Sequence, residues 1–133
     1  MSIIDSHTIH AGEYPQNVRV RAHSFSSDAS VAAGGQDSAP GPHDYFDSAL
    51  ATCKAITAMW YAKRQNIPLE RVEAHVESDA TDERAGIYRM RVRVELFGPL
   101  TAEQRAQVLR AIAACPIHKL MTTADVQIET VEP

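Results

Sequence analysis

The sequence predicts an α+β fold in which an antiparallel sheet packs against a long buried central helix. Apolar and polar residues alternate in several short stretches, and apolar residues recur at helical spacing in two longer ones. These stretches follow one another in the order strand, long helix, hairpin, helix, short turn, strand. The chain has 133 residues and neither an internal repeat nor an interdomain linker, so we expect a single domain over residues 1–133.

The first predicted strand is the alternating stretch "NVRVRAH". Its apolar residues share one face: Val18, Val20 and Ala22. Arg19 and Arg21 share the other face. Glycines and prolines then exclude regular structure from residues 27–44, where Asp28 is expected to support a turn.

A long helix is predicted from Asp44 to Gln65, before Asn66 and Pro68 end it. The side chains that recur near its 3.6-residue period are Phe46, Ala49, Leu50, Cys53, Ile56, Thr57, Trp60 and Tyr61. Further apolar residues cover much of the remaining circumference. A helix that is apolar on nearly all sides is buried in a larger core or against another subunit, so we expect Trp60 to belong to the core.

Two alternating stretches joined by the polar segment "ATDERAG" predict a β-hairpin. Its inner face is predicted to carry Val72, Ala74, Val76, Tyr88, Met90, Val92, Val94 and Leu96. The arginines that alternate with these residues on the second strand are more typical of a solvated sheet face than of an anion site.

A second amphipathic helix is predicted after Thr101, because Thr101 and Gln104 have the spacing of a capping box. Pro116 suits the first position of a further short helix. The stretch "DVQIETV", with Val126 and Ile128, is predicted to form a final strand.

Charge and hydropathy exclude several classes of partner. The chain has 13 Lys and Arg against 17 Asp and Glu, a net charge of −4, and no basic run, so it lacks the electrostatic footprint of a nucleic-acid-binding protein. Its start lacks the regions of a secretory signal, and its longest apolar run is interrupted by Lys54 and is too short to span a bilayer. We expect a cytoplasmic protein with no membrane partner.

Cys53 and Cys115 are the only cysteines. In the cytoplasm such a pair is more often catalytic, redox-active or metal-binding than structural, although free cysteine also fills cores. Cys115 precedes Pro116 and is predicted to cap a helix, where unpaired N–H groups lower a thiol pKa from about 8.5. Local electrostatics therefore favour Cys115 as the nucleophile. Cys53 lies in mid-helix and needs another cation, for which Lys54 is a poor candidate because it points about 100° away around the helix.

Zinc binding is the competing chemistry, and the available ligands are Cys53, Cys115, His118 and His43. Structural zinc usually requires closely spaced ligand pairs at both ends of the site, and Cys53 has no such neighbour. The chain also shows no nucleophile elbow, and "AAGGQD" does not follow the glycine pattern of a Walker or dinucleotide-binding loop. No metal or cofactor is expected.

The stretch "GGQDSAPGPHDYFDSALATCKAITAMWYAKRQNIPLERVEAHVE", followed downstream by "ACPIHKLM", resembles the OsmC/Ohr family (osmotically inducible protein C / organic hydroperoxide resistance). The resemblance extends over nearly the whole chain from about Arg21 and is strongest to the broad OsmC-like branch. It implies a small α+β subunit in an intertwined homodimer, with the long central helices packed together and active sites at the interface.

The resemblance also implies a thiol peroxidase in which Cys53, and not Cys115, attacks the substrate. The Cys53 thiolate would attack an organic or fatty acid hydroperoxide, release the alcohol and become a sulfenic acid. Cys115 would then form a disulfide with it, and an external dithiol would reduce that disulfide.

In the family, an arginine from the N-terminal region and a glutamate before the helix activate the thiolate. The candidates here are Arg19 or Arg21 for the arginine and Asp44, or His43, for the glutamate. The implied catalytic residues are therefore Cys53, Cys115, Asp44, Arg19 and Arg21. Because the arginine and glutamate match imperfectly, the alternative is a redox-sensing or apolar-ligand-binding module on the same fold without fast peroxidase turnover.

Overall fold

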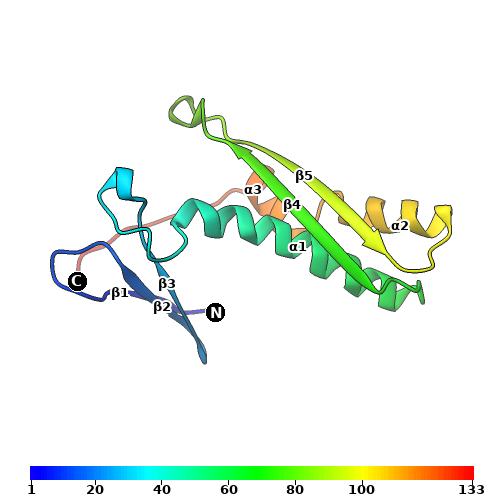
Figure 1. Ribbon diagram of the computed structural model, residues 1–133, viewed down its shortest axis with the longest axis horizontal. Coiled ribbons are helices and arrows are strands. Elements are labelled where there is room, and N and C mark those ends of the chain that lie inside the picture. The colour runs from blue at the N-terminus through cyan, green and yellow to red at the C-terminus, as the bar shows by residue number, and fades with distance from the viewer. The chain divides into compact units, whose positions relative to one another are not determined.

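A computed structural model describes residues 1–133. The chain forms two compact units, Met1–Phe46 and Asp47–Pro133. Figure 1 shows their helices and strands along the chain. The α+β class, with antiparallel sheets and a long helix, is confirmed, whereas a single domain over residues 1–133 stays a prediction.

The first unit contains a three-stranded antiparallel sheet in the order β1–β2–β3. The strands are β1 (Ile4–Thr8), β2 (Gln16–Val20) and β3 (His23–Ser27). The predicted strand was too long, because Arg21 adopts a φ of 52° in the tight turn between β2 and β3. β1 and β3 were not predicted, because their sequences, IDSHT and HSFSS, are mostly polar and lack an apolar alternation.

The loop after β3 is organised by one buried carboxylate, as predicted for Asp28. Its Oδ2 accepts hydrogen bonds from the Ser38 hydroxyl (2.7 Å), the Ser38 N–H (3.0 Å) and the Gln36 N–H (3.1 Å). These bonds outweigh burial and lower the pKa of Asp28 to about 2. The loop also contains the short 3-10 helix η1 (Val31–Ala33) and leads into α1 (Pro42–Arg64).

The second unit contains the hairpin of β4 (Arg71–Asp79) and β5 (Arg89–Phe97), followed by α2 (Ala102–Ile112) and α3 (Pro116–Thr122). A short 3-10 helix, η2 (Glu83–Ala85), lies in the hairpin connection. In Figure 1 the hairpin lies across α1, with α2 beside it. The core residues come from these elements and the connection after α1: Ala58, Ala62, Ile67, Leu69, Leu96, Val108 and Ile112. The hairpin and its predicted inner face are confirmed.

The long helix is confirmed, but its buried side differs from the prediction. Four residues of α1 are buried in the single chain, and they follow one another at four-residue spacing: Leu50, Lys54, Ala58 and Ala62. Ile56 and Trp60 are instead exposed, by 69 % and 57 %. The Arg64 guanidinium lies 5.0 Å from the centre of the Trp60 ring. Because Trp60 is exposed, the prediction that it is a core residue was wrong for the single chain.

The C-terminal region bears out two of its three predictions. Thr101 and Gln104 form a complete capping box at the start of α2, and Pro116 begins α3. Residues 125–131 form no strand, because Val126 and Ile128 are exposed and no neighbouring strand pairs with them. None of the helices is both long enough and apolar enough to cross a membrane.

Candidate active site

The two cysteines come together at the start of α3. Cys53 lies on α1 and is partly exposed, whereas Cys115 is 1 % exposed and occupies the N-cap of α3. The Cys115 thiol interacts with the Cys53 sulfur, which also lies 3.9 Å from the Thr57 hydroxyl. Neither cysteine is in a disulfide. The fold therefore brings together two thiols that are 62 residues apart in the sequence.

The N-terminus of α3 acts on both sulfurs. Pro116 leaves the first turn without one N–H, and the next two N–H groups, those of Ile117 and His118, face Cys53 and Cys115 respectively. The Cys115 side chain makes no cap hydrogen bond, although the His118 N–H lowers its pKa. The predicted N-cap position is correct, but the helix end also serves the other cysteine.

The pKa values of the two thiols are shifted in opposite directions. Burial opposes ionisation of Cys53, but the Ile117 N–H, the Cys115 thiol, the Thr57 hydroxyl and the Lys54 charge together outweigh it and lower its pKa. Burial raises the pKa of Cys115, and the Cys53 sulfur raises it further against the opposing effect of the His118 N–H. The local-electrostatic prediction that Cys115 is the more acidic thiol was therefore wrong, because it left out the hydrogen bonds that the fold provides to Cys53 and the effect of the Cys53 sulfur on Cys115.

Lys54 belongs to the site, although its direction around the helix made it a poor candidate for the cation beside Cys53. It is buried, at 6 % exposure, and its ammonium donates to the carbonyls of Ile112 (2.8 Å) and Ala113 (3.2 Å). Its charge lowers the pKa of both cysteines. The 100° offset from Cys53 directs Lys54 into the core beside the end of α2, from where its charge still reaches the thiols.

His118 completes the surroundings of Lys54. Its Nδ1 lies 3.1 Å from the Lys54 ammonium, and an ammonium can only donate, so Nδ1 accepts and the ring proton resides on Nε2. A fixed positive charge thus occupies the place where a metal ion would use the His118 lone pair. This arrangement disfavours the zinc set that the sequence offered.

The other three predicted site residues belong to the first unit. Arg19 is exposed on β2, and Arg21 lies in the turn after it. The Asp44 carboxylate accepts a hydrogen bond from the Gly41 N–H at 2.8 Å in the first turn of α1. Their roles toward Cys53 stay predictions.

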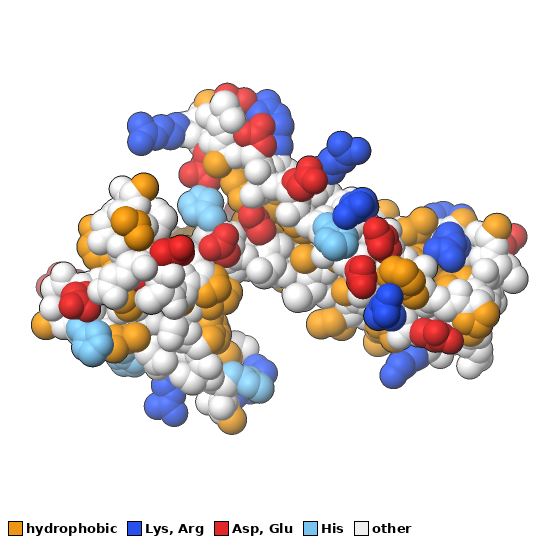
Figure 2. All heavy atoms as spheres, in the orientation of Figure 1, with side chains coloured by type: hydrophobic (Ala, Val, Ile, Leu, Met, Phe, Trp, Pro, Cys, Tyr) orange, Lys and Arg blue, Asp and Glu red, His pale blue; other side chains and the backbone are white.

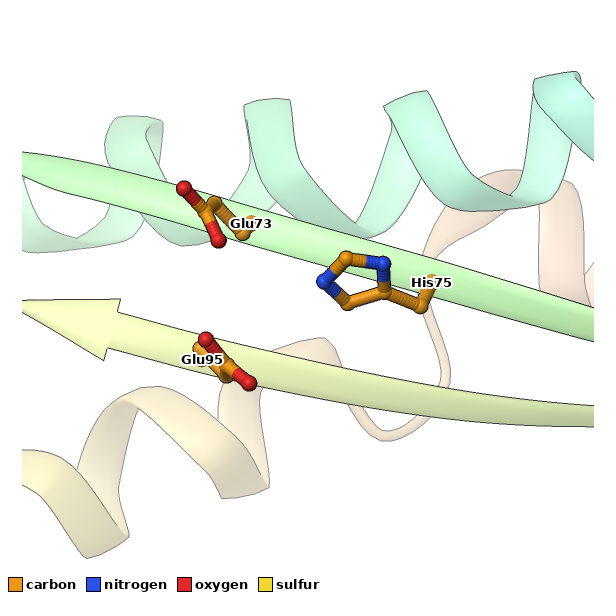
Figure 3. A group of neighbouring side chains, drawn as sticks. All are labelled: Glu73, His75 and Glu95. Carbon is orange, nitrogen blue, oxygen red and sulfur yellow. The ribbon is translucent and has the colours of Figure 1, made fainter.

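A second cluster of possible metal ligands lies on the outer face of the hairpin (Figure 3). Glu73 and His75 from β4 and Glu95 from β5 point toward one another, with ligand atoms within 4.8 Å. Each carboxylate is also within 3.7 Å of an arginine, Arg71 or Arg93. Figure 2 shows acidic, basic and histidine side chains interspersed over this hairpin. The cluster therefore has the charge pattern of the solvated face that the sequence predicts.

Exposure and acidity together predict selective modification of one cysteine. We expect iodoacetamide at neutral pH to alkylate Cys53 at least about tenfold faster than Cys115, because only thiolates react and Cys115 is buried with a raised pKa. Peptide mapping by mass spectrometry during a limited reaction measures both rates. In urea the two rates should converge. Faster labelling of Cys115 in the folded protein would contradict this assignment.

Comparison with known proteins adds a family and a fold. The family model described as OsmC-like protein matches residues 35–131. No curated protein matches the chain in sequence.

Solved structures of several bacterial proteins share the fold. An OsmC-like protein from Mycoplasma pneumoniae is 17 % identical with a TM-score of 0.73, covering 92 % of this chain and 88 % of its own. A putative osmotic stress induced and detoxification response protein from Psychrobacter arcticus is 18 % identical with a TM-score of 0.72, covering 89 % and 88 %. The organic hydroperoxide resistance protein OhrB of Bacillus subtilis is 20 % identical with a TM-score of 0.60, covering 92 % and 91 %. At these identities the similarities establish the fold.

Proposed function

Because the chain belongs to the OsmC-like protein family, we propose that it is a thiol-dependent peroxidase that reduces organic or fatty acid hydroperoxides. The observation that carries this proposal is the pair of neighbouring free thiols whose pKa values are shifted in opposite directions. Peroxide reduction requires one thiolate that attacks and a second thiol close enough to resolve the product. Several proteins with the same fold are described as organic hydroperoxide resistance proteins, which agrees with this chemistry.

In the first step the Cys53 thiolate attacks the outer oxygen of the hydroperoxide. The O–O bond breaks, the alkoxide takes up a proton and leaves as the alcohol, and Cys53 becomes a sulfenic acid. The sulfur has lost two electrons and the peroxide has gained them. The lowered pKa of Cys53 supports this role, because it increases the thiolate fraction at neutral pH.

In the second step Cys115 attacks the Cys53 sulfenic acid. A disulfide forms and water leaves, and an external dithiol then restores both thiols by exchange. The burial of Cys115 supports the resolving role, since a thiol that is 1 % exposed is protected from direct attack by peroxide. Its position beside Cys53 shortens the lifetime of the sulfenic acid.

We further propose a homodimer in which the long helices pack together. Ile56 and Trp60 lie one turn apart on α1 and are both more than half exposed in the single chain. A second copy would cover this apolar stripe, so that α1 would be buried on nearly all sides, as its composition predicts. The imperfect arginine and glutamate match motivates the alternative function, a redox-sensing or apolar-ligand-binding module without fast turnover, in which an apolar ligand would lie at the dimer interface.

Titration with peroxide tests the proposal. One equivalent of cumene hydroperoxide added to the reduced protein should consume both thiols within seconds, and peptide mapping should find a Cys53–Cys115 disulfide. Thiol counting after reduction by a dithiol should recover two thiols. If both thiols survive the peroxide, the peroxidase proposal fails and the ligand-binding alternative is favoured.

A further inference from the structure

Lys54 is a buried cation without an acidic partner. Its three N–H donors are all in use, by the carbonyls of Ile112 and Ala113 and by the Nδ1 of His118. None of these acceptors carries a formal negative charge. Burying an ammonium without a counter-charge is strongly unfavourable, so this arrangement calls for an anion nearby.

The three acceptors around Lys54 account for the position of its charge but do not neutralise that charge. Ile112 ends α2 and Ala113 follows it, so their carbonyls present the negative end of the helix dipole. Three acceptors hold the ammonium in one place and leave it no freedom to swing toward solvent. A fixed buried charge is suited to act on a neighbouring group through its field.

The Lys54 ammonium contacts the Ala113 carbonyl and the His118 ring, which flank Cys115 in the sequence. The groups beside it that can become anions are therefore the two cysteines, and Cys53 is the more acidic of them. The groups that face the Cys53 sulfur are the Ile117 N–H of α3, the Cys115 thiol, the Thr57 hydroxyl and the Lys54 charge. Lys54 supplies the only full positive charge among them. We propose that Lys54 is the fixed counter-charge of the Cys53 thiolate and takes the part for which the sequence offered Arg19 or Arg21.

This role makes Lys54 a positioning residue, because all its N–H groups are engaged elsewhere and it acts on sulfur through space. The inference deepens the proposed function and rests on it for its purpose, but the counter-charge can be measured without peroxide. Stabilising the reduced thiolate also favours reduction of the Cys53–Cys115 disulfide, since the thiolate is released when the disulfide is opened.

Alkylation kinetics test the counter-charge directly. The variants are Lys54→Met, which removes the charge and the donors, and Lys54→Gln, which keeps an N–H donor without charge. The matched control is Lys63→Met, at an exposed lysine on the same helix. Rates of Cys53 alkylation by iodoacetamide are measured against pH by peptide mapping of the full chain, with circular dichroism to verify folding.

We expect both Lys54 variants to raise the pH midpoint of Cys53 alkylation, so that at pH 6.5 the rate falls about tenfold, while Lys63→Met matches the wild type. The same variants should make the disulfide about tenfold harder to reduce in a thiol redox buffer, a shift of about 30 mV. A merely structural role for Lys54 would leave both quantities unchanged in a folded variant.

A folded Lys54→Met protein with the wild-type midpoint would overturn the inference. A raised midpoint in Arg19→Met or Arg21→Met, but not in Lys54→Met, would assign the cation to that arginine. If the Lys54 variants do not fold, the wild-type protein still decides: the Lys54 Cε NMR signal should shift with the Cys53 midpoint and the Lys63 signal should not. If these results hold while cumene hydroperoxide is not reduced, only the proposed function fails.

Discussion

Replacing Cys53 with serine should abolish the reduction of cumene hydroperoxide, lowering kcat/KM by at least about 10³-fold. A serine hydroxyl is not ionised at neutral pH, so neither the Ile117 N–H nor the Lys54 charge can convert it into a nucleophile. The measurement is steady-state peroxide consumption with a dithiol reductant. Full activity of the Cys53→Ser protein would refute the assignment of Cys53 as the attacking thiol.

The Cys115→Ser protein is the matched comparison, because it removes the other sulfur with the same substitution. It should consume one equivalent of peroxide and then accumulate a Cys53 sulfenic acid, since no neighbouring thiol remains to resolve it. Mass spectrometry after trapping with dimedone detects that species. The two variants together separate attack from resolution, and identical behaviour of the two would contradict the division of labour.

The sequence predicted best the elements whose signal is local. The capping box of Thr101 and Gln104, the Pro116 helix start and the alternating hairpin all depend on residues close together in the chain, and all three are confirmed. The polar strands β1 and β3 were missed because their pairing partners, not their own apolar pattern, define them. The strand predicted near Val126 failed for the converse reason, since it has an alternating pattern but no partner.

The site was only half predictable for the same reason. Both cysteines were identified from their sequence settings, and the N-cap position of Cys115 followed from the proline after it. The acidity order followed from the hydrogen bonds made to Cys53 and from the effect of the Cys53 sulfur on the buried Cys115, which the sequence does not display. A helical angle measured at the backbone excluded Lys54, but the position of its charge depends on the carbonyls of Ile112 and Ala113, which are 58 and 59 residues away.

Gly98 should be the glycine least tolerant of a side chain in the second unit. It adopts a φ of 141°, and a Cβ placed there would lie 2.3 Å from the Pro68 carbonyl oxygen and 3.1 Å from the Glu70 nitrogen. The two chain segments are held together at this point, because the Glu70 N–H donates to the Phe97 carbonyl at 2.8 Å. The obstacle is backbone on both sides, so no side-chain rotation can relieve it.

We expect Gly98→Ala to lower the free energy of unfolding by about 3 kcal/mol or more, through strain and overpacking together. Gly86→Ala is the matched control, because Gly86 also has a positive φ, 86°, but a Cβ added to it would have no atom within 4 Å. Its cost should be that of the left-handed conformation alone, about 1 kcal/mol. Urea unfolding of the two variants measures the difference. Equal losses would mean that the backbone of Pro68 and Glu70 moves to accept the added Cβ. The close approach of Gly98 to this backbone would then not fix the start of α2, the helix whose other end contacts Lys54.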